Sequence, residues 1–239
     1  AASDVYKRQV NVVTNQDVLI NSYIQEKDQF SLTNDNAFAA DGNAIVWATT
    51  DRSANPYRGV LHTYDLATNT ARILQTAPGN NRYEDLLLHG SILFYTLVEV
   101  TTGDSTPYIW DLSQASPQQV GGISGRIDDF SSRYFVWADI HAQAIDIVDR
   151  STGQEEDGIT QNCIRPALSQ DRPYATCLDF NNQQFRLVRL PSGASTPFAV
   201  GQADTGQFGT IFNDRVFWLV FNNGATTSNE IAYFDIPQN

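Results

Sequence analysis

The chain has no methionine, only two cysteines and no long apolar run, and each of these absences limits what it can be. Hydrophobic residues make up 41% and charged residues 18% of its 239 residues, a balance typical of a globular chain. Because no stretch of about 18 apolar residues occurs, the sequence predicts no membrane insertion. The net charge of -12 repels phosphate backbones, so we expect no nucleic-acid partner.

The N-terminal residues indicate where the protein is expected to act. Residue 1 is Ala and not Met, as in a fragment of a longer chain or in a secreted or cell-surface chain whose signal peptide has been removed. Ser3–Gln9 resembles a translated sequencing adapter, which raises the question whether residues 1–9 are native. We assign residues 1–16 to an N-terminal arm and residues 17–239 to a single domain.

Five sequence units recur along the chain at a spacing of 40 to 48 residues. Each unit has a landmark residue in or at the end of an apolar segment: an aromatic at Trp47, Tyr95, Trp137 and Trp218, and Cys177 in the fourth unit. The apolar runs are short, rich in β-branched and aromatic residues, and punctuated by Gly, Asn and Pro, which predicts strands and not helices. Blades of four-stranded β-propellers repeat at about this length, roughly 40–45 residues.

The repeats predict an all-β fold, a five-bladed β-propeller of four-stranded antiparallel blades. A single repeat cannot bury its own faces, so neighbouring sheets must stack. Closing the stack radially leaves only short, protected sheet edges. In this arrangement the aromatic residues that mark the units are expected to fill the core between blades: Trp47, Tyr95, Trp137 and Trp218.

A second feature follows in most units, an apolar residue and then Asp before a turn. These residues are Asp65, Asp111, Asp149 and Asp235, with Arg189 in the fourth unit. An Asp beside a Ser-, Thr- or Gly-rich turn can accept hydrogen bonds from the backbone amides of that turn. We therefore interpret the four aspartates as turn caps.

The two ends of the chain are expected to complete the ring. The fifth unit ends directly after its third strand, and Asp17–Gln25 alternates apolar and polar residues as a strand does. We predict that Asp17–Gln25 is the outer strand of the last blade. Val10–Val13 has no place in the repeat, and it could pair beside Asp17–Gln25 or join the sheet edge of a neighbouring copy.

Cys163 and Cys177 are placed to form a disulfide. If Cys163–Leu168 pairs with Arg172–Cys177 through a short turn, the two cysteines lie opposite each other, within bridging distance. A disulfide here implies an oxidising compartment, and two free buried thiols are the alternative. A metal site at these residues is not expected, because no CxxC motif or nearby His accompanies them.

The segment Gly42–Ile73, with its GN-x-IVW and YDL-x-T-x-T motifs, resembles the TolB-like propeller repeats of bacterial and archaeal secreted and cell-surface proteins. The resemblance covers about Asp35 to Ile236. It implies an extracellular β-propeller, and it says little about activity because propellers host many unrelated functions.

The sequence offers few residues for catalysis. His62, His89 and His141 fall at different places in the repeat, and no GxSxG, P-loop or HExxH motif occurs. Some five-bladed propellers are glycoside hydrolases that present carboxylates from inner strands, and such chemistry needs two carboxyls about 5–9.5 Å apart. The candidates for that role, or for a Ca²⁺ site in the axial channel, are Asp35, Glu84, Asp85 and Asp128.

These residues do not share one level of the predicted ring, so we predict a non-catalytic extracellular binding or structural module without a cofactor. Its expected partner is a protein, a glycan or copies of itself, bound through its loops or its N-terminal arm. A glycan-active hydrolase that uses the inner-strand carboxylates is the alternative.

Overall fold

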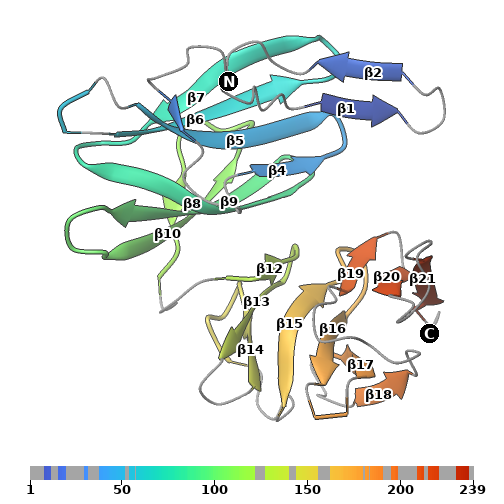
Figure 1. Ribbon diagram of the computed structural model, residues 1–239. Helices are drawn as coiled ribbons and strands as arrows, with labels where there is room; N and C mark the ends of the chain where they lie inside the picture. The colour runs from blue at the N-terminus through green and yellow to red at the C-terminus, as the bar shows by residue number, and fades with distance from the viewer. Residues whose placement is uncertain are drawn as a thin grey trace. The chain divides into compact units, whose positions relative to one another are not determined.

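The computed structural model describes residues 8–11, 16–19, 30–31, 38–51, 54–56, 58–121, 127–139, 144–155, 162–179, 181–182, 184–190, 195–198, 209–212, 215–220 and 230–236. Every regular element in these ranges is a β-strand (Figure 1). None of them is a helix that could cross a bilayer. The chain divides into two compact units, Ala1–Ile123 and Ser124–Asn239, which are described separately.

The first unit contains a two-stranded arm sheet and two larger antiparallel sheets. The arm sheet pairs β1 (Arg8–Asn11) with β2 (Gln16–Leu19). The first sheet consists of β3 (Phe30–Ser31), β4 (Phe38–Asp41), β5 (Ala44–Asp51), β6 (Arg58–Asp65) and β7 (Thr70–Thr76). The second sheet consists of β8 (Asn81–His89), β9 (Ile92–Glu99), β10 (Ser105–Asp111) and β11 (Gln118–Gln119).

The second unit contains three more antiparallel sheets, each built from strands in chain order. The third sheet consists of β12 (Asp129–Phe130), β13 (Tyr134–Asp139) and β14 (Ala144–Asp149). The fourth consists of β15 (Cys163–Leu168), β16 (Tyr174–Asp179), β17 (Gln184–Arg189) and β18 (Ser195–Phe198). The fifth consists of β19 (Gly209–Phe212), β20 (Arg215–Val220) and β21 (Glu230–Asp235).

One backbone hydrogen bond recurs in four of the repeats. The residue after the third strand donates to the residue just before the second strand, at 2.7 to 2.9 Å. The donor and acceptor pairs are Leu66 with Asn43, Leu112 with Ser91, Arg150 with Arg133, and Leu190 with Pro173. The sequence repeats are therefore structural repeats, and the prediction of an all-β chain of antiparallel sheets is confirmed; the number of blades stays a prediction.

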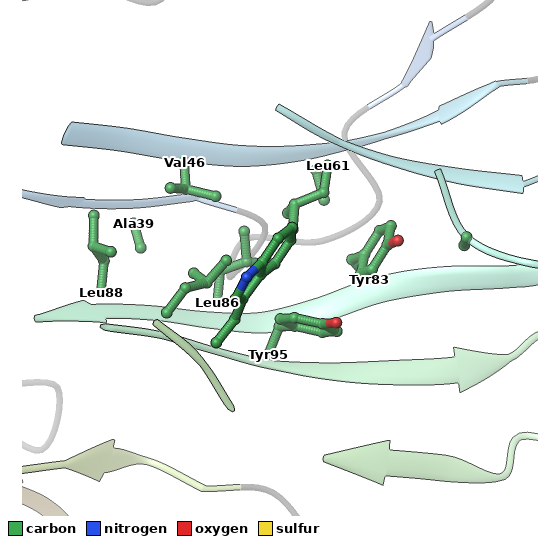
Figure 2. Packing of buried hydrophobic residues seen from close by; sticks show 11 residues of the cluster. Ala39, Val46, Leu61, Tyr83, Leu86, Leu88 and Tyr95 are labelled. Atoms are coloured by element: carbon green, nitrogen blue, oxygen red, sulfur yellow. The ribbon is translucent and has the colours of Figure 1, made fainter. Parts of the chain in front are cut away.

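The core of the first unit lies between the first and second sheets. Figure 2 shows Val46 and Leu61 of the first sheet facing Tyr83, Leu86 and Tyr95 of the second. Period-two alternation along β5 and β9 sends every second side chain to this interface. Burying one large aliphatic or aromatic side chain contributes about 1.5–3 kcal/mol, so this interface is the main source of stability in the unit.

The second unit contains two apolar clusters that likewise involve neighbouring sheets. Val136, Ile147 and Cys177 belong to a cluster between the third and fourth sheets. Leu178 and Phe185, on the other face of the fourth sheet, pack with a cluster that includes residues of the fifth sheet and of the segment after it. The fourth sheet is therefore apolar on both faces, as a sheet stacked between two neighbours must be.

The landmark residues of the five sequence repeats do not all face a described neighbouring sheet. Tyr95 packs against the first sheet and Cys177 against the third, so each faces the sheet that precedes its own. Trp47 lies on the face of β5 that is turned away from the second sheet, in a small cluster with Ile45 and Tyr64. Trp137 is half-buried, and the side chain of Trp218 lies outside the described residues.

Cys163 and Cys177 form a disulfide, with 5.6 Å between their Cα atoms. The sequence predicted that the two cysteines lie directly opposite each other, and this register is wrong. Cys163 pairs with Asp179, which lies two residues after Cys177 on β16. The register shifts at a bulge between Ile164 and Ala167. Pro lacks the N–H that a regular ladder needs, and Pro166 lies in this bulge. The bridge thus joins diagonal neighbours on one face of the hairpin.

The N-terminal arm adopts one of the two arrangements expected for it. Val10 pairs with Asp17, and β1 and β2 form an antiparallel pair. The remaining part of the predicted closing strand, residues 20–25, lies outside the described residues. Closure of the last blade by this segment therefore stays a prediction.

The first two sheets come into close backbone contact at Gly59 in β6. A Cβ atom there would lie 2.9 Å from Arg82 Cα and 3.0 Å from Tyr83 Cδ2, both in β8. A side chain at this position would force the backbones apart, because one of the two contacts is with main chain. Glycine at position 59 thus permits the core interface of the first unit to close.

We expect Gly59→Ala to destabilise the protein by about 1–3 kcal/mol, the usual cost of overpacking. Urea unfolding followed by circular dichroism measures this change. Gly121→Ala is the matched control, because a Cβ at Gly121 meets no atom within 4 Å. Equal stability of the two variants would contradict the close approach.

Candidate functional site

A groove of about 740 Å³ opens at one end of the first and second sheets. This volume lies within the usual range of ligand pockets, about 300–1,000 Å³. The turns that follow β4 and β8 occupy equivalent places in the two repeats and contribute Gly42 and Gly90 to the lining. Both glycines have positive φ, 54° and 58°, which these tight turns require.

Asp41 joins the two sheets at the groove. Its Oδ2 atom accepts a hydrogen bond from the backbone N–H of Gly90 at 2.7 Å. A carboxylate that accepts from an N–H forms a charge-assisted bond, which is stronger than a neutral one. The contact therefore holds the equivalent turns of neighbouring repeats side by side and shapes the groove between them.

The ends of β6 and β7 form the wall of the groove in the first sheet. Thr63 pairs with Arg72, and Asp65 pairs with Thr70, so all four residues share one face of the sheet. Asp65 caps the turn that follows, because its Oδ1 accepts N–H bonds from Ala67 at 2.8 Å and from Thr68 at 3.1 Å.

Arg72 is exposed on this wall. Within the described ranges its guanidinium makes no hydrogen bond or ion pair, and the side-chain amide of Asn43, in the turn between β4 and β5, makes none either. The groove thus combines unused donors on Arg72 with unused acceptor capacity on Asp41 and Asp65. Such an arrangement can bind a polar ligand without any covalent chemistry.

The four predicted catalytic carboxylates do not form a described pair. Glu84 forms an ion pair with Arg82, two residues earlier on the same face of β8, and its side chain is 14% exposed. Asp128 accepts the N–H of Ala138 at 2.8 Å through Oδ2. Asp85 sits in the bulge of β8 with φ of 51°, and Asp35 lies outside the described residues.

The histidines are placed at separate structural positions. His62 stacks on Trp47, with ring centroids 5.1 Å apart, and its Nε2 lies 2.8 Å from Thr49 Oγ1. His89 ends β8, and His141 lies outside the described residues. Across the part of the chain that the structure describes, no three His, Cys, Asp or Glu residues are grouped to hold a metal ion. The Ca²⁺ site stays a prediction.

Two more predicted caps bind their own turns. The Oδ1 of Asp111 accepts the N–H of Ser113 at 3.0 Å, which lowers the pKa of that carboxyl. Hydrogen bonds from Ser151 and the nearby Arg133 hold the pKa of Asp149 far below its usual range.

The remaining cap, Asp235, interacts differently. Its Oδ1 forms an ion pair with Arg215 Nε at 2.6 Å. That carboxylate raises the pKa of the Arg215 guanidinium. The turn after Asp235 lies largely outside the described residues, so its capping stays a prediction.

Sequence reasoning missed three residues of the groove, Asp41, Asn43 and Arg72. The signal that could have found them is the repeat itself. Stacked repeats bring equivalent turns together, so the Asp-Gly turn at 41–42 had to meet the His-Gly turn at 89–90. Arg72 carries no such signal, because an isolated charged residue on an outer strand is ordinary surface.

Comparison with known proteins bears on the fold. No protein-family model and no curated protein matches the chain in sequence. Oligogalacturonate lyase from Vibrio parahaemolyticus superimposes with a TM-score of 0.62 at 10% identity, over 100% of this chain and 74% of that one. An oligogalacturonate lyase in complex with manganese gives 0.58 at 10% identity, over 98% and 72%.

The β-propeller domain of the Trilobed protease from Pyrococcus furiosus gives a TM-score of 0.53 at 10% identity, over 87% of this chain and 69% of that one. TolB from Acinetobacter baumannii is also a neighbour, with 0.49 at 15% identity, over 89% and 55%. The chain therefore has a β-propeller fold, as the repeat spacing predicted. Identities this low concern the fold alone.

We expect Asp149→Asn to remove a pH-dependent part of the stability. Because the folded-state pKa of Asp149 is lowered, its contribution is present above the ordinary Asp pKa of about 3.9 and is lost as the pH falls below it. The difference in unfolding free energy between wild type and variant should be largest at neutral pH and should shrink toward pH 2.

Urea unfolding at a series of pH values measures this difference. Asp146→Asn is the control, because Asp146 lies on the same strand and its carboxylate accepts no hydrogen bond from any described residue. A profile for Asp149→Asn that runs parallel to the wild type would show that ionisation of Asp149 contributes no pH-dependent stability.

Proposed function

We propose that this protein is a non-catalytic extracellular β-propeller that acts as a binding or structural module. The disulfide between Cys163 and Cys177 supports an extracytoplasmic site of action, because such bonds persist in oxidising compartments. The groove between the first two sheets is its binding surface. Its N-terminal arm offers a second route, association with further copies of the chain.

The observation that carries this proposal is how the acidic residues are used. Glu84 and Asp128, two candidates for hydrolysis, are engaged by Arg82 and by the Ala138 N–H. Glycoside hydrolysis needs two carboxyls that face one bond, one of them able to donate a proton. The groove residues instead present donors and acceptors around open space, which suits recognition.

A glycan-active enzyme is the second candidate, with Asp35, Glu84, Asp85 and Asp128 as its catalytic carboxylates. Two of the fold neighbours are named as oligogalacturonate lyases, so this architecture does accommodate activity on glycans. Fold likeness does not carry activity with it, because propeller scaffolds host unrelated functions. Reaction products distinguish the two candidates.

We expect the protein to release no new reducing or unsaturated ends from neutral or acidic polysaccharides. A reducing-end assay, together with absorbance of unsaturated uronides, measures both hydrolysis and elimination. Product formation that disappears in Glu84→Gln or Asp128→Asn would replace the binding proposal by the enzymatic one. Asp146→Asn is the control, since Asp146 is an acidic residue outside both the groove lining and the set of candidate carboxylates.

We expect deletion of residues 1–14 to lower the molar mass in solution if the arm joins copies of the chain. Light scattering coupled to size-exclusion chromatography measures that mass. Deleting residues 1–7 is the matched control, because it leaves β1 (Arg8–Asn11) in place and should preserve the assembly. The same mass for all three chains would rule out assembly through the arm.

A further inference from the structure

We infer that the groove between the first two sheets binds a neutral, hydroxyl-rich saccharide. This inference rests on the proposed binding function and names the ligand class of that site. It follows from the hydrogen-bonding groups that the fold leaves unused at the groove, and from the signs of the charges among them.

The unused groups include both acceptors and donors. Asp41 accepts a backbone N–H hydrogen bond through Oδ2 only, and Asp65 accepts two through Oδ1 only. Their other oxygens accept no bond from any described residue. The guanidinium of Arg72 and the side-chain amide of Asn43 are likewise without protein partners in the described ranges.

The charges of the groove exclude simple ions as the best ligand. An anion could use Arg72 but would meet the carboxylates of Asp41 and Asp65. A cation could use those carboxylates but would meet the guanidinium. A hydroxyl group is both a donor and an acceptor, so a ligand with many hydroxyls can satisfy all of these groups at once. Neutral saccharides carry such groups on every ring.

The walls of the groove also allow close approach of a ligand to the backbone. A Cβ atom placed on Gly42 or Gly90 would meet no protein atom within 4 Å, so open space lies beside both turns. Ring hydroxyls can therefore reach main-chain groups of the two turns as well as side chains. The volume of about 740 Å³ falls in the range of pockets that hold small organic ligands.

Amide signals of the ¹⁵N-labelled full chain test this inference. The probes are maltohexaose, cellohexaose, mannohexaose and chitohexaose, with trigalacturonate as an anion and spermine as a cation. We expect at least one neutral probe to shift the signals of Gly42, Gly90 and Ser91 at millimolar concentration. Arg72→Ala should weaken that binding about tenfold or more, because hydrogen bonds to charged groups are stronger than neutral ones.

Ile73→Ala is the matched control, since Ile73 is 61% exposed on the same strand and its side chain points to the other face. Unchanged affinity in Arg72→Ala would overturn the role of the groove. Shifts of the groove signals by trigalacturonate or spermine alone would overturn the ligand class.

Shifts by neutral saccharides only at other amides would overturn the groove as the binding surface, while a non-catalytic binding function at another surface would stand. Absence of shifts with every probe would overturn the saccharide inference. The proposed function would then be judged by the product assays and the arm deletion, which do not depend on the groove.

Discussion

Burial of apolar side chains on both faces of a sheet, seen in the first and fourth sheets, is the constraint on which this structure depends. An antiparallel sheet commonly buries one face and leaves the other in water. Here the strands are apolar on both sides: along β5, Val46 enters the core with the second sheet, while Ile45 and Trp47 form a buried cluster on the opposite face. A sheet of this kind is stable only between two neighbours, so the chain must stack its repeats.

Stacking in one orientation explains where the candidate site arises. In the first unit, equivalent turns of the two repeats lie at the same end of the sheets. Side chains in these turns are not required to fill the core, so polar residues can occupy them. Asp41 uses one oxygen to join its turn to that of the next repeat, and Asp65 uses one to cap its own turn. The fold uses only one carboxylate oxygen of each of these residues, so the other oxygen can accept a hydrogen bond from a ligand.

The features that could be predicted from sequence are those set by nearby residues. Asp65 and Asp149 bond amides within three residues of themselves, so their surroundings are visible in the sequence. The pairing of Glu84 with Arg82 is equally local and could have been foreseen from their shared strand face. The register of the cysteines could not, because a bulge at Pro166 displaces Cys163 along its partner strand.

The all-β, repetitive character of the chain can be predicted without coordinates, because strand periodicity and turn residues are local signals repeated five times. The placement of the two cysteines in one hairpin can be predicted in the same way. The packing of the folded chain was needed to learn which sheet faces are shared, which carboxylates are engaged, and where unused polar groups lie near Arg72. Those outcomes depend on contacts between residues distant in the chain, and such contacts follow from how whole sheets pack.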